Sequence, residues 1–471
     1  MEDSVGGFIS VMRRSHMLRL VAVGFLALVL QIPIGMIGSL IMERQQRQQS
    51  AVAEISSKWG RSQALTGPAL VIPYSHRWSE TGPNGAQVTR SEIRHAIFLP
   101  EKIEIQGKVD TELRHRGIFS IPVYRLSLTV LGEFSRPDFA DLGLDPGAAA
   151  WERAQLAIGI SDAHAILEQA AVSWNGQRVG FLPGPGVLPY EDAGIHAVVG
   201  VAPGADRLTF SFPLTLNGSL GLYFVPFGQE TIVDLESNWP SPSFQGNWLP
   251  SNRTVSGQGF SARWSVPFLG RNYPQAWTSE AQMSKPIEAS RFGFNLIDPV
   301  DPYRMAARSV KYAGLYILLT FVSVWLTEVI AGLRVHPIQY LLLGAALCLF
   351  YLLELSLSEH LGFPAAYVAA SLAVIAMVGA YSLSVFRSRP KAAVAALGVS
   401  ALYGYLYVLL RNEDYALLIG SMGLFVILAT VMVVTRRVDW YAIGGRERVQ
   451  RGSPCGAHPA APTHGGTDAP S

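Results

Sequence analysis

The sequence predicts a membrane protein with one N-terminal transmembrane helix, a large mainly-β, sandwich-like domain outside the cytoplasm, and a C-terminal bundle of five transmembrane helices. The transmembrane helices are predicted by apolar stretches that are long enough to cross a bilayer. One such stretch lies near the N-terminus, and five lie close together after residue 310. The long polar segment between them alternates apolar and polar residues, as half-buried strands do.

The first span is predicted over residues 18–42, where the chain is apolar for longer than the roughly 20 residues needed to cross a bilayer core. A cleaved signal peptide is the competing interpretation, because Ala51-Val52-Ala53 resembles a cleavage site and Arg13-Arg14 resembles a twin-arginine signal. The apolar run exceeds a usual signal core of about 7–15 residues, and polar residues 43–50 separate it from that site. We therefore predict a retained anchor.

The other five spans are bounded by charged residues or by turns with Pro or Gly. They are predicted over residues 311–331, 338–357, 364–386, 392–410 and 415–435. Residues 1–17 then form a short N-terminal segment, and residues 437–471 form a tail that is partly disordered, given its Gly, Pro, Ala and Thr content.

Positive charge sets the orientation, since Lys and Arg in short loops stay in the cytoplasm. With the N-terminus inside, the cytoplasmic segments carry Arg13, Arg14, Arg19, Arg334, Arg387, Arg389, Lys391, Arg436, Arg437, Arg446, Arg448 and Arg451. The opposite short loops carry only Arg411. Both termini are therefore predicted to be cytoplasmic, with the middle domain, residues 43–310, on the other side.

The middle segment is close to neutral, with 23 Lys and Arg against 25 Asp and Glu over residues 43–308. It has no basic block, so we expect no nucleic acid partner. Alternation over residues 125–130, 208–216 and 260–266 predicts strands. Asn217-Gly218 predicts a tight hairpin between residues 208–216 and 220–224, because both residues accept positive φ. Helices are expected only at residues 43–60, continuing the first span, and at 148–156.

Several stretches resemble a known family. The longest is Ser-Asn-Trp-Pro-Ser-Pro-Ser-Phe-Gln-Gly at residues 237–246, and others are His-Pro-Ile-Gln-Tyr-Leu-Leu at 336–342, Ser-Glu-His-Leu-Gly-Phe at 358–363 and Asp-Trp-Tyr at 439–441. Together they resemble the CreD family of bacterial inner-membrane cell envelope integrity proteins. The resemblance implies an inner-membrane protein with a periplasmic domain, linked to envelope stress and to a two-component system. It implies no particular reaction.

Two acidic residues lie within predicted spans, where an ionisable group costs on the order of 2.5–3.5 kcal/mol unless it is paired or hydrated. Glu328 lies near the predicted cytoplasmic end of the second span, and Glu354 lies near the predicted outer end of the third. They could belong to a proton or ion path. Alternatively, each lies close enough to an interface to reach water, which is the interpretation that we favour here.

Glu359 and His360 lie at the predicted outer end of the third span. A histidine there could respond to external pH, because its unperturbed pKa is about 6.5. The simpler interpretation is that this polar pair caps the helix.

A cluster of aromatic residues, Trp239, Phe244 and Trp248, lies in the segment that resembles the family. Exposed rings there could contact glycan, such as peptidoglycan, or another envelope protein. Alternatively, the rings complete the core, as most large aromatic side chains do.

No catalytic, metal-binding or cofactor-binding motif is present. We therefore expect no cofactor, and the favoured function is a non-enzymatic envelope protein whose first partner is the lipid bilayer. A transporter or channel formed by the C-terminal helices and a membrane-anchored periplasmic hydrolase remain as alternatives.

Overall fold

The computed structural model describes residues 16–436, apart from 82–86, 189–191, 203–204, 297–300, 332–334, 387 and 413. Arg13, Arg14, Arg334, Arg387 and the tail 437–471, on which part of the predicted topology rests, lie outside the described residues. The chain divides into two compact units. A helical unit comprises the chain up to Glu43 and from Pro302 onward, and a β unit comprises Arg44–Asp301.

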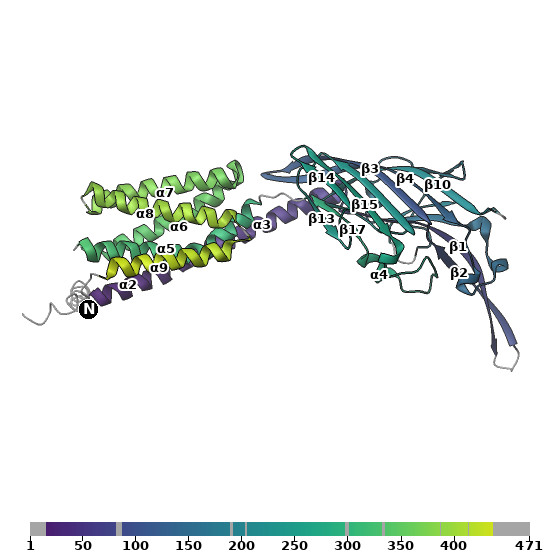
Figure 1. Ribbon diagram of the computed structural model, residues 1–471, viewed down its shortest axis with the longest axis horizontal. Coiled ribbons are helices and arrows are strands. Elements are labelled where there is room, and N and C mark those ends of the chain that lie inside the picture. The colour runs from purple at the N-terminus through teal and green to yellow at the C-terminus, as the bar shows by residue number, and fades with distance from the viewer. Residues whose placement is uncertain are drawn as a thin grey trace, which may run out of the picture. The chain divides into compact units, whose positions relative to one another are not determined.

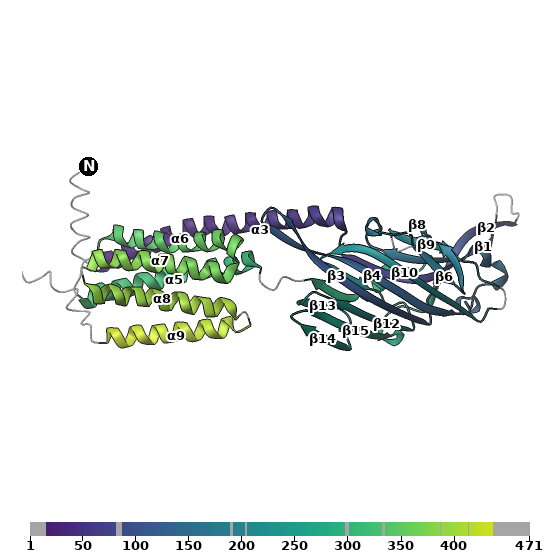
Figure 2. The same ribbon diagram turned by 90° about the horizontal axis from the view of Figure 1, so that it is seen from above.

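The predicted N-terminal helix and the five C-terminal helices are confirmed. The helices are α2 (His16–Val29), α3 (Gln31–Trp59), α5 (Pro302–Ala331), α6 (Pro337–Leu361), α7 (Phe363–Phe386), α8 (Arg389–Arg411) and α9 (Ala416–Thr435). Within the described residues, six helical stretches are long and apolar enough to cross a membrane, with α2 and α3 forming one of them. Figures 1 and 2 both show α5 to α9 lying side by side.

The last helix, α9, differs from its neighbours because none of its residues is buried. One side of it contacts α8. The hydroxyl of Tyr405 donates to the carbonyl oxygen of Ile419, and Gly423 faces the Tyr405 ring. Gly420 lies beside Leu409. Most exposed side chains of α9 are apolar, as expected for a helix next to lipid.

Two mixed sheets form the β unit, and the first has nine strands within the described residues. Its main path runs in the order β13 (Pro242–Gly246), β17 (Phe292–Leu296), β11 (Gly221–Phe224), β1 (Gln63–Thr81), β5 (Gln155–Ile160), β9 (Gly194–Val198) and β8 (Leu182–Pro183). Off this path, β2 (Gln87–Phe98) pairs with both β1 and β16 (Ala276–Thr278). Only the pairing of β1 with β11 is parallel among those described in this sheet.

The second sheet has eight strands among the described residues. Its order is β14 (Asn252–Ser256), β15 (Gly259–Pro267), β12 (Glu230–Ser237), β3 (Lys102–Arg116), β4 (Phe119–Ser135), β10 (Arg207–Ser219), β6 (Ala171–Trp174) and β7 (Gln177–Gly180). The long antiparallel pair β3 and β4 is its centre, and β12 lies parallel to β3. The strands predicted at residues 125–130, 208–216 and 260–266 are confirmed as parts of β4, β10 and β15.

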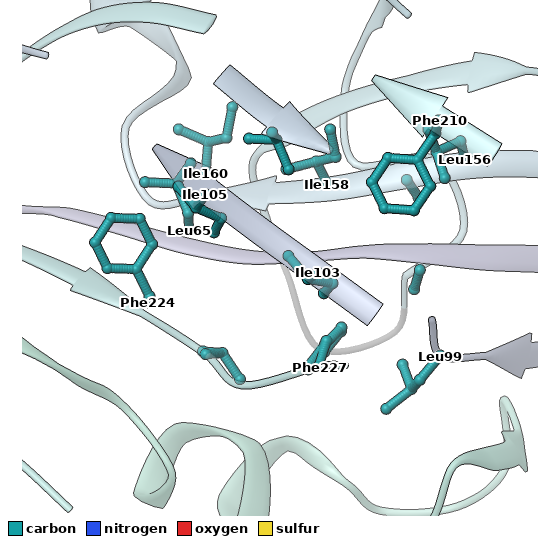
Figure 3. Close-up of a cluster of buried hydrophobic side chains, with 14 of the residues drawn as sticks. Leu65, Leu99, Ile103, Ile105, Leu156, Ile158, Ile160, Phe210, Phe224 and Phe227 are labelled. Atoms are coloured by element: carbon teal, nitrogen blue, oxygen red, sulfur yellow. The ribbon is translucent and has the colours of Figure 1, made fainter. Parts of the chain in front are cut away.

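One apolar core lies between the two sheets. Figure 3 shows Leu65 and Ile158 of the first sheet and Ile103, Ile105 and Phe210 of the second directed into it. Alternation explains this arrangement, since successive side chains of a strand point to opposite faces of its sheet. The predicted sandwich-like, mainly-β domain is therefore confirmed.

The hairpin predicted at Asn217-Gly218 is wrong. Strand β10 continues through both residues and stays paired with β4 as far as Ser219 opposite Val123. The chain turns at Leu220, which has a positive φ of 65°, and then enters the first sheet as β11. Gly218 is required because the Tyr124 ring occupies the place of a Cβ atom, not because a turn needs it.

The helical expectation for residues 43–60 is confirmed, since α3 extends to Trp59. The short helix expected at residues 148–156 is wrong. Two single 3-10 turns, Pro146–Ala148 and Trp151–Arg153, precede β5 there. Asp145 accepts a hydrogen bond from Gly147 N, and Pro146 begins the first turn. The segment is short because β5 takes over at Gln155 to complete the first sheet.

Three further single 3-10 turns and one short helix connect the strands. They are η1 (Ala140–Leu142), η4 (Ala163–Ala165), η5 (Phe268–Gly270) and α4 (Ser284–Ala289).

Candidate functional site

Glu354 is the most deeply buried acidic side chain of the helical unit, with 0% exposure. It projects from α6 toward α5, where the Ser309 hydroxyl donates to its Oε2 atom at 2.8 Å. Its other oxygen, Oε1, is buried without a hydrogen-bond partner. No ion pair with Glu354 occurs among the described residues. The expectation that this carboxyl group reaches water at an interface is therefore wrong, because neighbouring helices cover it completely.

Tyrosine rings from three helices pack together beside the turn of α6 that carries Glu354. They are Tyr351 on α6, Tyr367 on α7 and Tyr403 on α8, each at most 5% exposed. The Tyr367 hydroxyl donates to the carbonyl oxygen of Tyr403 at 2.7 Å, and the Phe350 ring contacts Tyr351, Tyr367 and Tyr403. The cluster joins α6, α7 and α8 around a polar centre.

Glu328, near the end of α5, is 3% exposed and is the second buried acid. The hydroxyl of Tyr340, in the first turn of α6, donates to its Oε2 atom at 3.1 Å. A small cavity of about 30 Å³ lies beside Tyr340, lined also by Gln339, Tyr381 and Ser382. This volume is close to the space of one water molecule.

The two acids do not form one site. Nineteen residues separate Ser309, the partner of Glu354, from Glu328, which corresponds to about 28 Å along α5 at about 1.5 Å per residue. Beyond Thr320 apolar side chains separate them, where Gly344 of α6 faces Leu30 and Phe321. Phe321 is fully buried, and its ring contacts Tyr340. The structure therefore shows two separate polar centres.

Glu359 and His360 lie in the last turn of α6 rather than acting as its cap. The helix ends at Gly362, which has a φ of 74° and whose N–H bonds to the Ser358 carbonyl oxygen. Glu359 is half-buried and accepts a hydrogen bond from the Tyr303 hydroxyl at 3.0 Å. His360 is exposed. The capping expectation is thus wrong, because this glycine closes the helix.

The predicted aromatic cluster packs on the core of the β unit instead of forming an exposed platform. Trp239, Phe244 and Trp248 are each half-buried against that core. Phe244 makes edge contacts with Phe260 and Trp264, and Trp248 makes one with Phe292. Since Trp264 is 0% exposed, these rings surround a buried indole. Their arrangement favours a structural role over glycan stacking.

A polar groove of about 360 Å³ lies on the outer face of the second sheet, next to the edge strand β14. Its charged lining residues are Asp234, Glu236, Arg253 and Arg263, and Arg263 pairs with Asp234 at 3.2 Å. The groove could accept a polar chain such as a glycan or a peptide, but its acids and bases are balanced. No group of three or more metal-binding side chains lies among the described residues.

Sequence reasoning missed Arg271, which is 8% exposed and forms no ion pair with a described acid. Its guanidinium donates to the carbonyl oxygens of Pro226, Phe227 and Gly228 and to the Gln275 side chain. Burial lowers the pKa of Arg271. The sequence carries no local signal for this residue, because the carbonyl groups that it binds lie more than forty positions away.

Comparison with known proteins agrees with this architecture. The family model described as inner membrane protein CreD matches residues 15–441. The inner membrane protein CreD of Escherichia coli (strain K12) is 33% identical over 419 residues, which cover 88% of this chain and 91% of that protein. The resemblance noted in the sequence is confirmed, and the chain belongs to the CreD family of inner membrane proteins.

Proposed function

We propose that this protein is a non-enzymatic, multi-pass inner-membrane protein that supports envelope integrity under stress by coupling a periplasmic β unit to the helical unit. The observation that carries this proposal is the continuity of α3. Its residues up to Glu43 belong to the helical unit, and its residues from Arg44 onward belong to the β unit. A helix is a stiffer connection than a flexible linker.

Apolar contacts attach the second half of α3 to the β3–β4 hairpin. Ala51 is 8% exposed and packs against Ile121 and Val123, which are both fully buried. Val52, Ile55, Trp59 and Phe119 surround this small cluster. The helix is therefore part of the fold of the β unit and not a tether beside it.

Polar contacts fix the end of α3. The indole of Trp59 donates to the Tyr124 carbonyl oxygen at 3.2 Å, and the Arg114 guanidinium lies 4.1 Å from the Trp59 ring centroid. Glu54 pairs with Lys58 at 2.8 Å and with Arg116 at 3.0 Å. The pKa of Glu54 is lowered, chiefly by the hydrogen bond from Lys58.

Replacing Trp59 with alanine is expected to release the end of α3 from the hairpin. Loss of a half-buried indole and its hydrogen bond removes about 1.5–3 kcal/mol locally, so amide hydrogens of residues 52–60 should exchange at least roughly tenfold faster. Hydrogen–deuterium exchange of the purified full chain measures this. Gln49→Ala, on the exposed side of α3, is the matched control.

The same pair of variants tests the coupling in cells. Trp59→Ala should fail to correct the envelope defects of a strain that lacks the protein, while reaching normal amounts in the membrane. Gln49→Ala should correct them. If Trp59→Ala loosens α3 and yet functions fully, then a firm attachment of α3 is unnecessary and the proposed coupling is wrong.

The proposed orientation places both termini in the cytoplasm and the β unit in the periplasm, and the charges of the short loops support it. Alkaline phosphatase, which folds only outside the cytoplasm, should be active when fused after Gly200. Green fluorescent protein fused after residue 436 should fluoresce. The assignment would be reversed if alkaline phosphatase fused after Gly200 were inactive while green fluorescent protein fused at the same position fluoresced.

Transport is the second candidate function, and the buried Glu354 is the observation that favours it. Uptake of ions by vesicles containing the purified protein, and its loss in Glu354→Gln, would support that role. Other envelope proteins and peptidoglycan are the proposed partners of the β unit. Crosslinking in the native envelope tests for a protein partner, and a pull-down of the purified chain with peptidoglycan tests for the glycan.

A further inference from the structure

A seam of buried polar side chains follows the contact between α5 and α6. Its members are all at most 6% exposed. They are Tyr303, Ser309, Tyr316 and Thr320 on α5, and Tyr351, Glu354 and Ser358 on α6. Glu354 is the one acid among them, and an acidic side chain within a membrane span is costly and points to a functional site.

The seam begins at the membrane face where α6 ends. There the Tyr303 hydroxyl donates a hydrogen bond to the half-buried Glu359, the residue after Ser358. Deeper along the seam, Ser309 bonds to Glu354. Beyond Thr320 on α5, the fully buried Phe321 packs against Gly344 and Tyr340 of α6 before the second polar contact, which joins Tyr340 to Glu328.

Glu354 lacks the partners that an ionised carboxylate needs. Ser309 supplies one hydrogen bond, and Oε1 has none. The titratable groups that face it are Tyr351 on α6, Tyr367 on α7 and Tyr403 on α8. An unpaired ion in such surroundings is costly, whereas a neutral carboxylic acid needs fewer partners.

A second unpartnered polar atom lies in the same cluster. The hydroxyl of Tyr316, two turns along α5 from Ser309, is buried without a hydrogen bond. The Oε1 atom of Glu354 and the hydroxyl of Tyr316 both lack a hydrogen-bond partner, so the hydrogen bonding of this cluster can change. A carboxyl group that gains or loses a proton would use these oxygens.

We propose that Glu354, about two turns before the end of α6, is a proton-binding site, and that its protonation stabilises the packing of α5 against α6. A proton fits this site without rearrangement, because a neutral carboxylic acid needs few partners. A metal cation such as Ca²⁺ takes about six to eight oxygen ligands, but Ser309 supplies the only hydrogen-bonding oxygen next to this carboxylate among the described residues. This inference does not depend on which membrane face is periplasmic.

The test compares the full-length protein in lipid nanodiscs with Glu354→Gln, an isosteric neutral variant. A carboxyl group that the folded state keeps protonated contributes stability at low pH and loses it as the pH rises. The melting temperature of the wild type should therefore fall relative to that of Glu354→Gln as the pH is raised from 5 to 9. Glu359→Gln, at the half-buried mouth, is the matched control and should leave the wild-type pH dependence largely intact.

Infrared spectroscopy of the wild type provides a measurement that does not require the variant to fold. The carbonyl stretch of a protonated carboxylic acid should be present at neutral pH and should disappear at alkaline pH. If no such band occurs in the wild type, the proposal is wrong. Where Glu354→Gln folds, it should lack the band, which assigns the band to Glu354. The proposal is overturned if the wild type and Glu354→Gln melt in parallel at every pH. It is also overturned if replacing choline chloride with sodium chloride at constant pH stabilises the wild type but not Glu354→Gln, because a metal cation would then be the ligand.

Discussion

Replacing Trp264 with alanine is expected to lower the free energy of unfolding of the β unit by about 3–5 kcal/mol, the usual cost of removing a fully buried indole. Trp264 is 0% exposed, and its ring lies 5.7 Å from that of Phe244 and 5.9 Å from that of Phe292. Its indole N–H donates to the Trp248 carbonyl oxygen at 3.3 Å. The cavity would lie where β13, β15 and β17 meet, which involves both sheets.

Thermal unfolding of the purified protein, followed by the strand signal in circular dichroism, measures this loss. Trp264→Phe keeps an aromatic ring and should show a smaller loss. Trp239→Ala removes a ring that is half-buried and is the matched control. If Trp239→Ala destabilises the β unit as much as Trp264→Ala does, then the core of this cluster is not centred on Trp264.

Replacing Arg271 with methionine should also destabilise the β unit strongly, by at least on the order of 3 kcal/mol. Each buried acceptor that loses its donor costs about 1–3 kcal/mol. The affected carbonyl oxygens of Pro226, Phe227 and Gly228 lie in the connection from β11 in the first sheet to β12 in the second. Arg271 itself lies in the connection from β15 back to β16, so one side chain joins two crossings between the sheets.

A third crossing is attached through Gln275. Its amide accepts from Arg271 and donates to the carbonyl oxygens of Leu99 and Pro100, between β2 and β3. Arg271→Lys, which retains a donor but not the planar guanidinium, should recover part of the stability. Arg253→Met, which replaces an exposed arginine of the same unit, should change the stability by less than about 0.5 kcal/mol. Equal stabilities of Arg271→Met and wild type would mean that water replaces the guanidinium.

Much of the fold was predictable because it follows from local patterns. Helices crossing a bilayer need long apolar runs, and strands with one buried face need alternation, as β15 shows between Phe260 and Val266. The prediction of a hairpin at Asn217-Gly218 was wrong because a long-range contact, and not the local preference for positive φ, determines the residue at position 218. The Tyr124 ring requires a glycine at 218, and its hydroxyl donates to the Gly221 carbonyl oxygen at 2.7 Å.

The candidate site was predictable only in part for the same reason. An acidic residue within an apolar run is visible in the sequence, so Glu354 and Glu328 could be selected. Their burial could not be predicted, since it depends on which helices cover them. Arg271 could not be selected at all, because an arginine between a glycine and an asparagine has no distinguishing neighbours. Its role arises from carbonyl groups contributed by a distant loop.

The last helix of the chain has a different kind of constraint from the rest. Because no side chain of α9 is buried, contact with lipid requires its side chains to be apolar but does not require them to have a particular shape. Evolution can therefore exchange leucine, isoleucine, valine and phenylalanine along most of it at little cost. The small residues opposite α8 are an exception, because a side chain at Gly423 would meet the Tyr405 ring and one at Gly420 would lie against Leu409.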